Sequence, residues 1–390
     1  SNFFVDLHHA HANVTFVAVD NTLTALQKAA GAYVEKFPHL VKIAVTGSSG
    51  KTTTKEILVS IMKQKYNVIS NKGNLNSETG LPLSVFNIRK EHECGIFEMG
   101  MNRENEIGEI SAVLKASFAI VTNIGTAHIG LLGSRENIAK EKAKVFDHFN
   151  NFGTGVIPCD DDFTEFLKDK IEGKVVLYGK DTDTVKYIAD LGLNGTKFSV
   201  GGIDTVLSLP GKYNYKNALG AIALAQVLGL TSEQISRGIN SLEPMFGRSQ
   251  VIEGKYTIVQ DCYNANPDSM EKSIEFVSSV NDGRKKVFVL GDMLELGEDS
   301  SKEHAKAGKL AAESSADMVI FAGDEMKAAY DSCGGSAEKF FHVPGRSDEA
   351  MKEIADKIAS LVPEKSIVLI KGSRGMGLER ITEILEGGER

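Results

Sequence analysis

The feature that most constrains the fold of this chain is a glycine-rich segment, Thr-Gly-Ser-Ser-Gly-Lys-Thr-Thr at residues 46–53. An apolar run that favours a strand, Val41–Thr46, precedes it, and an apolar stripe at helical spacing follows at Lys55–Lys65. Glycines let the backbone turn so that its N–H groups face phosphate oxygens, and the positive end of the following helix points at the same anion. The segment therefore predicts a nucleotide phosphate site on a strand–loop–helix unit of an α/β fold.

The side chains of this loop have separate expected roles. Lys51 would neutralise the β- and γ-phosphates of ATP, and the Thr52 hydroxyl would hold Mg²⁺. The spacing is G-x-x-G-K-T, because the first glycine of the longer G-x-x-x-x-G-K-[ST] pattern would fall on Val45. A turn with a surface lysine is the alternative, and the strand–loop–helix context disfavours it. The other loop residues expected to bind ATP are Gly47, Ser48, Ser49, Gly50 and Thr53.

Strand-like runs alternate with helical patterns along most of the chain, which predicts mostly parallel sheets flanked by helices. A second alternating series starts near Arg248, and 390 residues are too many for one core. We therefore expect a central P-loop ATPase domain at 41–246, decorated by short strands within Tyr187–Pro210, and a C-terminal Rossmann-like α/β domain at 247–390. The other strand candidates are Cys94–Met99, Phe118–Ile124, Lys174–Tyr178, Tyr256–Asp261, Lys285–Gly291, Met318–Gly323 and Ser366–Lys371, and helices are expected at Ser301–Glu313 and Ser347–Leu361.

Composition excludes several classes of function. The formal net charge of −8 disfavours a nucleic-acid partner or a membrane surface. No apolar run approaches the roughly 18 residues that a membrane span needs, so membrane insertion is not expected. The four cysteines are scattered without CxxC spacing, which favours reduced thiols. We expect a cytoplasmic monomer.

A family resemblance rests on the phosphate loop and an ordered set of further blocks. These are Asn74–Pro82, Glu98–Met101, Thr122–His128, Phe246–Arg248, Asp261–Pro267, Gly291–Gly297 and Lys371–Arg374. Together they resemble the Mur ligase superfamily, which also includes folylpolyglutamate synthetases, and the resemblance covers the chain from about Val14 to its C-terminus. It implies an ATP-dependent amide-bond ligase that phosphorylates a carboxylate and passes the acyl group to an amine.

The blocks at Asp261–Pro267 and Gly291–Gly297 are most similar to one branch of that family. The partners of that branch are a UDP-linked muramoyl tripeptide and D-alanyl-D-alanine, which it joins during peptidoglycan precursor synthesis. Two alternatives are another Mur-type ligase with a different amino acid and a nucleotide-binding subunit that no longer ligates. The presence of Lys51, Glu98 and Arg248 argues against the second.

The resemblance also implies metal ligands, because acyl-phosphate chemistry brings several negative oxygens together. Besides Thr52, it implies Glu98 and His128 as ligands for two Mg²⁺ sites. Lys142 would carry a carbamate formed with CO₂, which turns a cation into a carboxylate-like ligand. The alternatives are a solvated glutamate at a strand end, a structural loop histidine, and a surface lysine in the run Ala139–Val145, where the register is ambiguous.

Nucleotide contacts are implied in the second half of the chain. Asn214 and Asn217 have amides that can read adenine, although Tyr213 stands where relatives have histidine and helix capping is an alternative. Arg248 would reach the γ-phosphate when the domains close, and Asp261 resembles a ribose-binding aspartate.

Substrate contacts are implied by three blocks. Asn264 and Asn266 would line the site of the amine or phosphate. Arg374 lies in the same expected turn as Lys371 and Ser373, and it would help to hold an incoming carboxylate. A solvated basic turn is the alternative. The complete set expected to bind substrate is Asn74, Asn76, Ser77, Asn264, Asn266, Lys371 and Ser373.

Residues 1–40 are expected to be a reduced or incomplete N-terminal α/β domain that would bind the UDP end of the precursor. Phe3–Leu7 resembles an early strand, Val14–Val19 the last strand and Thr22–Tyr33 the exit helix. A module of roughly ninety residues is implied by the resemblance. We expect a gap between consecutive Cα atoms, longer than the usual ~3.8 Å, between Phe4 and Val14; an unbroken chain would mean a truly shortened domain.

Overall fold

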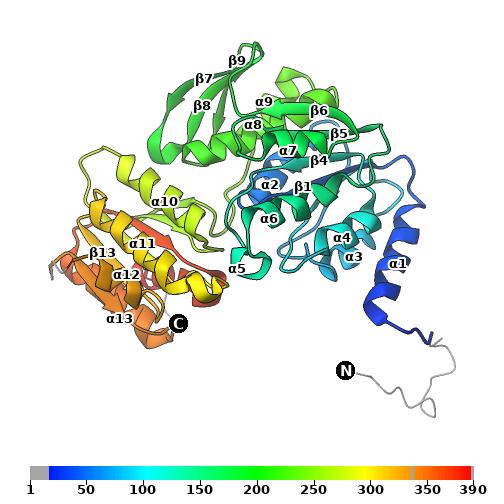
Figure 1. Ribbon diagram of the computed structural model, residues 1–390. Coiled ribbons are helices and arrows are strands. Elements are labelled where there is room, and N and C mark those ends of the chain that lie inside the picture. Colours follow the sequence, from blue (N-terminus) through cyan, green and yellow to red (C-terminus); the bar gives the residue numbers. More distant parts are fainter. Residues whose placement is uncertain (1–16, 335–337, 388–390) are drawn as a thin grey trace.

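The computed structural model describes residues 17–334 and 338–387, which form two α/β lobes (Figure 1). The central lobe runs from blue to green in the figure, and the C-terminal lobe from yellow to red. The prediction of an α/β fold with two alternating series is confirmed. Within the described ranges, no helix has the length and apolar content to cross a bilayer.

The central lobe is built on a parallel six-stranded sheet in the order β2-β3-β1-β4-β5-β6. Its strands are β1 (Val41–Thr46), β2 (Val68–Ser70), β3 (Cys94–Glu98), β4 (Phe118–Val121), β5 (Gly153–Pro158) and β6 (Gly173–Tyr178). β1, β3 and β4 are apolar along nearly their whole length because helices cover both faces of a parallel sheet. β1 lies at the centre, and the phosphate loop follows its carboxyl end, where open α/β sheets bind ligands.

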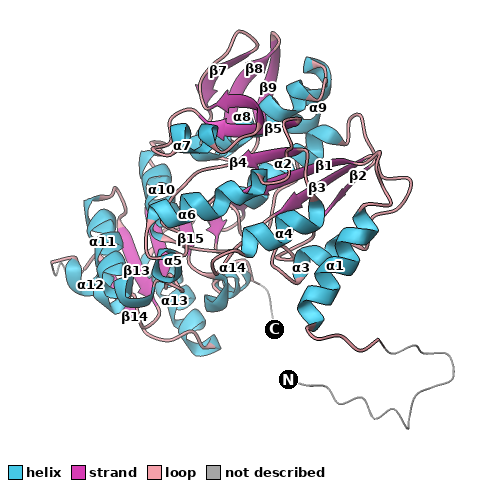
Figure 2. Cartoon of the chain, turned by 45° about the vertical axis from the view of Figure 1, so that its right-hand side comes forward, coloured by secondary structure: helices cyan, strands magenta, loops and turns pink. Residues whose placement is uncertain are grey.

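Helices cover the two faces of this sheet, and one face also carries a small second sheet (Figure 2). The helices on one face are α1 (Thr22–Val34), α3 (Gly80–Val85), α4 (Glu106–Leu114), α5 (Ile129–Leu132), α6 (Arg135–Ala143) and α7 (Thr164–Asp169). The other face packs against α2 (Lys51–Met62), α8 (Lys212–Val227), α9 (Ser232–Asn240) and the antiparallel strands β7 (Val185–Asp190), β8 (Thr196–Val200) and β9 (Ile203–Leu207).

The C-terminal lobe has a mixed six-stranded sheet in the order β10-β11-β15-β12-β13-β14, in which only the β10–β11 pair is antiparallel among the described strands. Its strands are β10 (Gln250–Glu253), β11 (Thr257–Asp261), β12 (Lys286–Gly291), β13 (Met318–Ala322), β14 (Phe340–Val343) and β15 (Ile367–Lys371). One face packs against α10 (Pro267–Ser279), α11 (Ser300–Glu313) and α12 (Lys327–Ser332), and the other against α13 (Asp348–Leu361) and α14 (Glu379–Leu385).

Several expectations about individual elements need correction. The helix after the phosphate loop begins at Lys51 rather than Lys55, because the loop residues themselves form its first turn. Val17–Val19 lack strand structure and are exposed, so that part of the expected strand Val14–Val19 is wrong; Val14 lies outside the described residues. The expected helix Thr22–Tyr33 is confirmed as α1. The strand expected at Phe3–Leu7 and the gap expected between Phe4 and Val14 also lie outside the described residues.

Candidate active site

A cavity of about 400 Å³ lies between the two lobes and collects most of the residues expected to act. The expected residues that line it are Ser48, Ser49, Gly50, Lys51, Thr52, Thr53, Asn74, Asn76, Ser77, Glu98, His128, Asn214, Asn217, Arg248, Asp261, Asn264, Asn266, Lys371 and Arg374. Gly47, Lys142 and Ser373 were also expected in the site but do not line the cavity.

The phosphate loop depends on two glycines with left-handed backbone conformation. Gly47 has a φ of 145° and Gly50 a φ of 79°. A Cβ on Gly47 would lie 1.8 Å from Thr122 Oγ1, and one on Gly50 would lie 2.4 Å from Asn217 Oδ1. The amine of Lys51 donates to the Gly47 carbonyl at 2.9 Å, and burial lowers its pKa despite the opposing charge of Glu98. The loop therefore holds the partly buried Lys51 amine against its own carbonyls.

A brace under the loop comes from Asn123, which the sequence analysis did not single out. Its Oδ1 accepts from the Ser49 backbone N–H at 3.2 Å, and its Nδ2 donates to the Ser49 carbonyl at 2.9 Å. The Asn123 carbonyl accepts from the Ser48 N–H at 3.0 Å, and the Thr122 hydroxyl donates to the Ser49 carbonyl at 2.6 Å. The loop after β4 thus fixes the shape of the phosphate loop.

Glu98 ends β3 and is almost fully buried, so it is not a solvated glutamate. Its carboxylate accepts from the Thr52 hydroxyl at 2.6 Å and from Asn76 Nδ2 at 2.7 Å. Asn71, another residue not expected from the sequence, holds the backbone of Glu98 through both its amide atoms at 2.9 Å. One carboxylate and one hydroxyl beside a phosphate loop form the kind of donor set that Mg²⁺ completes with phosphate oxygens and water.

The residues present fit a metal that the nucleotide helps to hold, rather than a cage made by the protein alone. Among the described residues, no three His, Cys, Asp or Glu side chains lie close enough together to hold a metal ion. His128 precedes α5 with a φ of 64°, and its Nδ1 lies 3.4 Å from Glu295 Oε2 without a well-directed hydrogen bond. His128 therefore lines the cavity with a buried Nδ1 that has no hydrogen-bond partner among the described residues.

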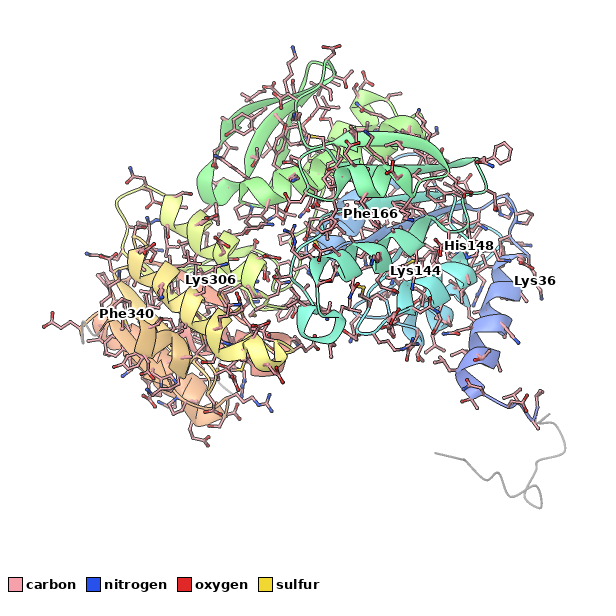
Figure 3. The ribbon with its side chains drawn as sticks, viewed as in Figure 1. Lys36, Lys144, His148, Phe166, Lys306 and Phe340 are labelled. Carbon is pink, nitrogen blue, oxygen red and sulfur yellow. The ribbon has the colours of Figure 1, made fainter. Side chains whose placement is uncertain are left out.

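Lys142 is the buried member of its lysine-rich helix. Its side chain is 1% exposed, and the described residues offer its amine no hydrogen bond or ion pair. Burial, and after it the charge of Lys51, hold the pKa of Lys142 well below its usual value. Lys140 is exposed, and Lys144 (Figure 3) pairs with Glu141 at 2.7 Å. A buried amine whose pKa is lowered in this way loses its proton more readily than an exposed lysine, which fits reaction with CO₂ because that reaction requires an unprotonated amine.

The two asparagines of α8 are buried and do not cap the helix. The residue that precedes α8 is Gly211, which has no side chain to cap it. Asn214 Nδ2 donates to the Pro210 carbonyl at 2.8 Å, and Asn217 Nδ2 donates to Asn214 Oδ1 at 3.4 Å. Asn217 also contacts the phosphate loop through Gly50. The pair therefore joins the start of α8 to the nucleotide end of the cavity.

On the C-terminal side, Asp261 and Lys371 form a buried ion pair of 3.0 Å at the ends of the adjacent strands β11 and β15. Asp261 also accepts from the Ser249 N–H at 3.1 Å and the Ser273 hydroxyl at 2.7 Å. Lys371, 2% exposed, donates to the Asn264 carbonyl at 2.8 Å, so it is not part of a solvated basic turn. The two charges fix the loops that follow both strands.

The other expected residues on this side have mixed placements. Asn266 is the N-cap of α10, with its side chain accepting from the Ser269 N–H at 2.9 Å. Ser373 is buried, and its hydroxyl accepts from the Leu294 N–H at 2.9 Å. Arg374 is half exposed and lies over the Phe246 ring at 5.1 Å.

Arg248 lies at the junction of the lobes, with its guanidinium 4.2 Å from the centre of the Tyr263 ring. The junction itself has left-handed backbone at Gly247 (φ 64°) and Ser249 (φ 51°). Across it, the Tyr213 hydroxyl and Ser249 Oγ lie 2.8 Å apart. Arg248 therefore lies at a turn that connects the lobes, on the rim of the cavity.

Comparison with known families identifies the class of protein that this fold and cavity define. The description "Mur ligase middle domain" matches residues 45–225, and "Mur ligase, glutamate ligase domain" matches residues 247–374. The chain belongs to the Mur ligase family.

Several individual members of the family are similar to this chain over most of its length. The chain is 40% identical over 370 residues to the UDP-N-acetylmuramoyl-tripeptide–D-alanyl-D-alanine ligase of Treponema pallidum, covering 95% of this chain and 80% of that protein. It is 33% identical over 385 residues to the ligase of the same name from Bacillus subtilis, covering 96% and 81%. Among solved structures, MurF from Acinetobacter baumannii superposes with a TM-score of 0.86 at 31% identity over 95% of this chain and 82% of that one. MurF ligase from Thermotoga maritima in complex with ADP gives 0.84 at 28% identity over 97% and 87%.

Proposed function

We propose that this chain is an ATP-dependent ligase that joins D-alanyl-D-alanine to UDP-N-acetylmuramoyl-tripeptide in peptidoglycan precursor synthesis, acting as a monomer in the cytoplasm. One observation carries the proposal: a single cavity brings the phosphate loop of the central lobe together with Arg248 and Asp261 of the C-terminal lobe. The similarity to ligases of that name over most of the chain supports the choice of substrates.

The central lobe would hold ATP. Backbone N–H groups of the phosphate loop and the Lys51 amine bind the β- and γ-phosphates, and the amine leaves the Gly47 carbonyl to do so. Asn214 and Asn217 would contact the adenine, and Asp261 the ribose; all three line the cavity. Thr52, Glu98, His128 and a carbamylated Lys142 would hold two Mg²⁺ ions, which neutralise phosphate charge when bound.

Two displacements then make the amide bond. A carboxylate oxygen of the tripeptide attacks the γ-phosphorus, which forms the acyl phosphate and releases ADP. The amine of the dipeptide attacks the acyl carbon, a tetrahedral intermediate forms, and it collapses with loss of inorganic phosphate and a proton from nitrogen. Arg248 lies at the junction of the lobes, so closure would bring its guanidinium from Tyr263 to the transferring phosphoryl group.

The other expected residues would bind the two substrates. Asn74, Asn76 and Ser77 line the central side of the cavity beside Glu98, where the tripeptide carboxylate must approach the γ-phosphate. Asn264 and Asn266 line the opposite side, and Arg374 would bind the dipeptide carboxylate. Lys371 and Ser373 would act indirectly, because their side chains are hydrogen-bonded to the backbones of Asn264 and Leu294.

The test is a phosphate-release assay on the purified chain. Release should require ATP, D-alanyl-D-alanine and the UDP-linked tripeptide together. Release that proceeds equally well when a single amino acid replaces the dipeptide would refute the proposed substrate, and release with neither acceptor would refute ligation.

A further inference from the structure

The carboxylates that line the cavity differ in how many hydrogen bonds they accept from the protein and in how exposed they are. Four line the cavity among the described residues: Glu98, Glu106, Asp261 and Glu295. Glu98 and Asp261 each accept at least two hydrogen bonds, as described above. Glu106 accepts from the Asn102 N–H at 2.7 Å and, more weakly, from two other backbone N–H groups. Only Glu295 has its charge exposed in the cavity, with a side chain that is 63% exposed.

Glu295 is held in position by its backbone rather than by its side chain. It has a φ of 70°, a left-handed conformation that a residue with a side chain adopts at a cost. The buried His304 accepts from the Met293 N–H at 3.0 Å through Nε2, and Ser373 accepts from the Leu294 N–H. Two consecutive backbone bonds just before Glu295 therefore fix the loop that presents it.

The loop presents this carboxylate across the cavity to the central lobe. Glu295 Oε2 lies 3.4 Å from Nδ1 of His128, which itself has left-handed backbone at φ 64°. His128 lies on the loop that begins with Thr122 and Asn123, the two residues that brace the phosphate loop. A contact of 3.4 Å with poor direction is weak, so a bound cation can replace it at little cost.

The charges around the cavity favour a positively charged ligand at this one position. Its other charged lining groups include six cations: Lys51, Lys216, Arg248, Lys272, Lys371 and Arg374. An ammonium group placed beside any of these would be repelled, and burying it without a partner is costly. The Ser373–Leu294 hydrogen bond also ties the Glu295 loop to the turn that carries Arg374. The two lie on connected segments and carry the opposite charges needed for the two ends of a zwitterion, and the substrate carboxylate would replace Glu379, which pairs with Arg374 at 2.8 Å.

We propose that Glu295 binds the ammonium group of the incoming dipeptide and holds that nitrogen next to the acyl phosphate, where it loses one proton to solvent before the neutral amine attacks the acyl carbon. This inference rests on the proposed function and adds a residue that contacts the amine substrate. It makes Glu295 a determinant of specificity for a zwitterionic acceptor, with Arg374 at the carboxylate end.

The experiment compares Glu295→Gln with Glu298→Gln, an exposed glutamate three residues along the chain that does not line the cavity. In steady-state phosphate release, Glu295→Gln should raise the KM for D-alanyl-D-alanine by roughly ten- to a hundredfold, the loss expected for a charge-assisted hydrogen bond. The KM values for ATP and for the tripeptide precursor should stay within about twofold, because those ligands do not contact the carboxylate. Glu298→Gln should match the unaltered chain, and Glu295→Asp should recover part of the loss.

A second measurement separates an ammonium site from a structural role. D-lactoyl-D-alanine, which has a hydroxyl in place of the ammonium, should inhibit the unaltered chain far more weakly than the dipeptide binds to it, and Glu295→Gln should remove most of that difference. An unchanged KM for the dipeptide in Glu295→Gln, while the unaltered chain uses the dipeptide, would overturn this inference alone. An increased Mg²⁺ requirement with an unchanged dipeptide KM would assign the carboxylate to the metal and also overturn it. If the unaltered chain does not use the dipeptide, both proposals fall.

Discussion

The two walls of the cavity are built differently. On the central wall, Glu98 is buried and the partly buried Lys51 donates to the Gly47 carbonyl, while Asn123 braces the phosphate loop. On the C-terminal wall, the side chains of Glu295 and Arg374 are more than half exposed, although His304 and Ser373 anchor the loop before Glu295 and Arg374 pairs with Glu379 at 2.8 Å. The central wall, where we propose that ATP binds, is therefore preorganised, whereas the C-terminal wall, proposed to bind the amine substrate, presents more exposed side chains. Substitutions in the first should mainly abolish chemistry, and those in the second should mainly change affinity.

The largest effect should come from Lys51→Ala. Removing the cation that faces the transferring phosphoryl group should lower phosphate release by about 10³-fold. The fold should persist, because burial already disfavours this charge, and a thermal unfolding scan would show an unchanged or higher midpoint. Lys63→Ala, at an exposed lysine just after the same helix, is the matched control. Near-normal turnover in Lys51→Ala would contradict the expectation that substitutions in the central wall of the cavity abolish the chemistry.

Lys142→Ala should cost somewhat less, about 10²-fold, through loss of a metal-supporting carbamate. In the unaltered chain, activity should fall in CO₂-depleted buffer and return when bicarbonate is added. Only the neutral amine reacts with CO₂. Because the pKa of Lys142 lies well below the ordinary 10.5, the carbamate should form at pH values where exposed lysines are charged and be lost as pH falls through the lowered pKa. Activity that is independent of CO₂ across that range would contradict the carbamate.

A moderate effect is expected at the contact between the lobes. Asp268 Oδ2, in the first turn of α10, accepts from the Thr126 N–H at 2.8 Å and its hydroxyl at 3.1 Å. Asp268→Asn should weaken this bridge and raise the KM for ATP by a few-fold, roughly the value of one charged hydrogen bond. X-ray scattering should show a larger radius of gyration without ligands than with an ATP analogue and both substrates. Glu275→Gln, exposed on the same helix, should behave as the unaltered chain does. A profile that ligands leave unchanged would argue against closure.

The smallest effect should come from the turn between the lobes. Gly247→Ala places a Cβ at a φ of 64°, 3.0 Å from the Tyr263 N atom, and should destabilise the chain by about 1–2 kcal/mol in urea unfolding. Gly283→Ala, at a φ of 81° with open space around its Cβ, has the same kind of backbone cost without the contact. Gly247→Ala should lower turnover by a few-fold and Gly283→Ala should not. Equal turnover in the two variants would show that the turn plays no part in closure.

The sequence predicted the fold and much of the cavity because the relevant signals are local. A phosphate loop is contiguous, and residues such as Glu98 and Asp261 stand directly at the ends of apolar runs that become parallel strands. The role of Asn123 depends on a contact with Ser49 from 74 positions away, which no local pattern records.

Burial was also beyond the reach of the local pattern. Lys140, Lys142 and Lys144 look alike in the sequence, and only the packing of α6 separates the buried amine from its neighbours. Glu295 was overlooked because its position results from a left-handed residue and two distant acceptors, His304 and Ser373. Contacts between residues far apart in the sequence therefore determine the burial of Lys142 and the position of Glu295, which composition and periodicity do not predict.

The stacking of Arg248 on Tyr263 has an optical consequence. The chain contains no tryptophan, so when it is excited at wavelengths that phenylalanine does not absorb, its ultraviolet emission comes from its nine tyrosines. When the guanidinium leaves the Tyr263 ring for a phosphate, that ring loses a cation 4.2 Å from its centre. A Phe246→Trp variant would place the chain's single indole beside Arg374 and next to the turn, where it can be excited at wavelengths that tyrosine does not absorb. Its emission would follow the proposed closure of the two lobes in real time, without an attached dye.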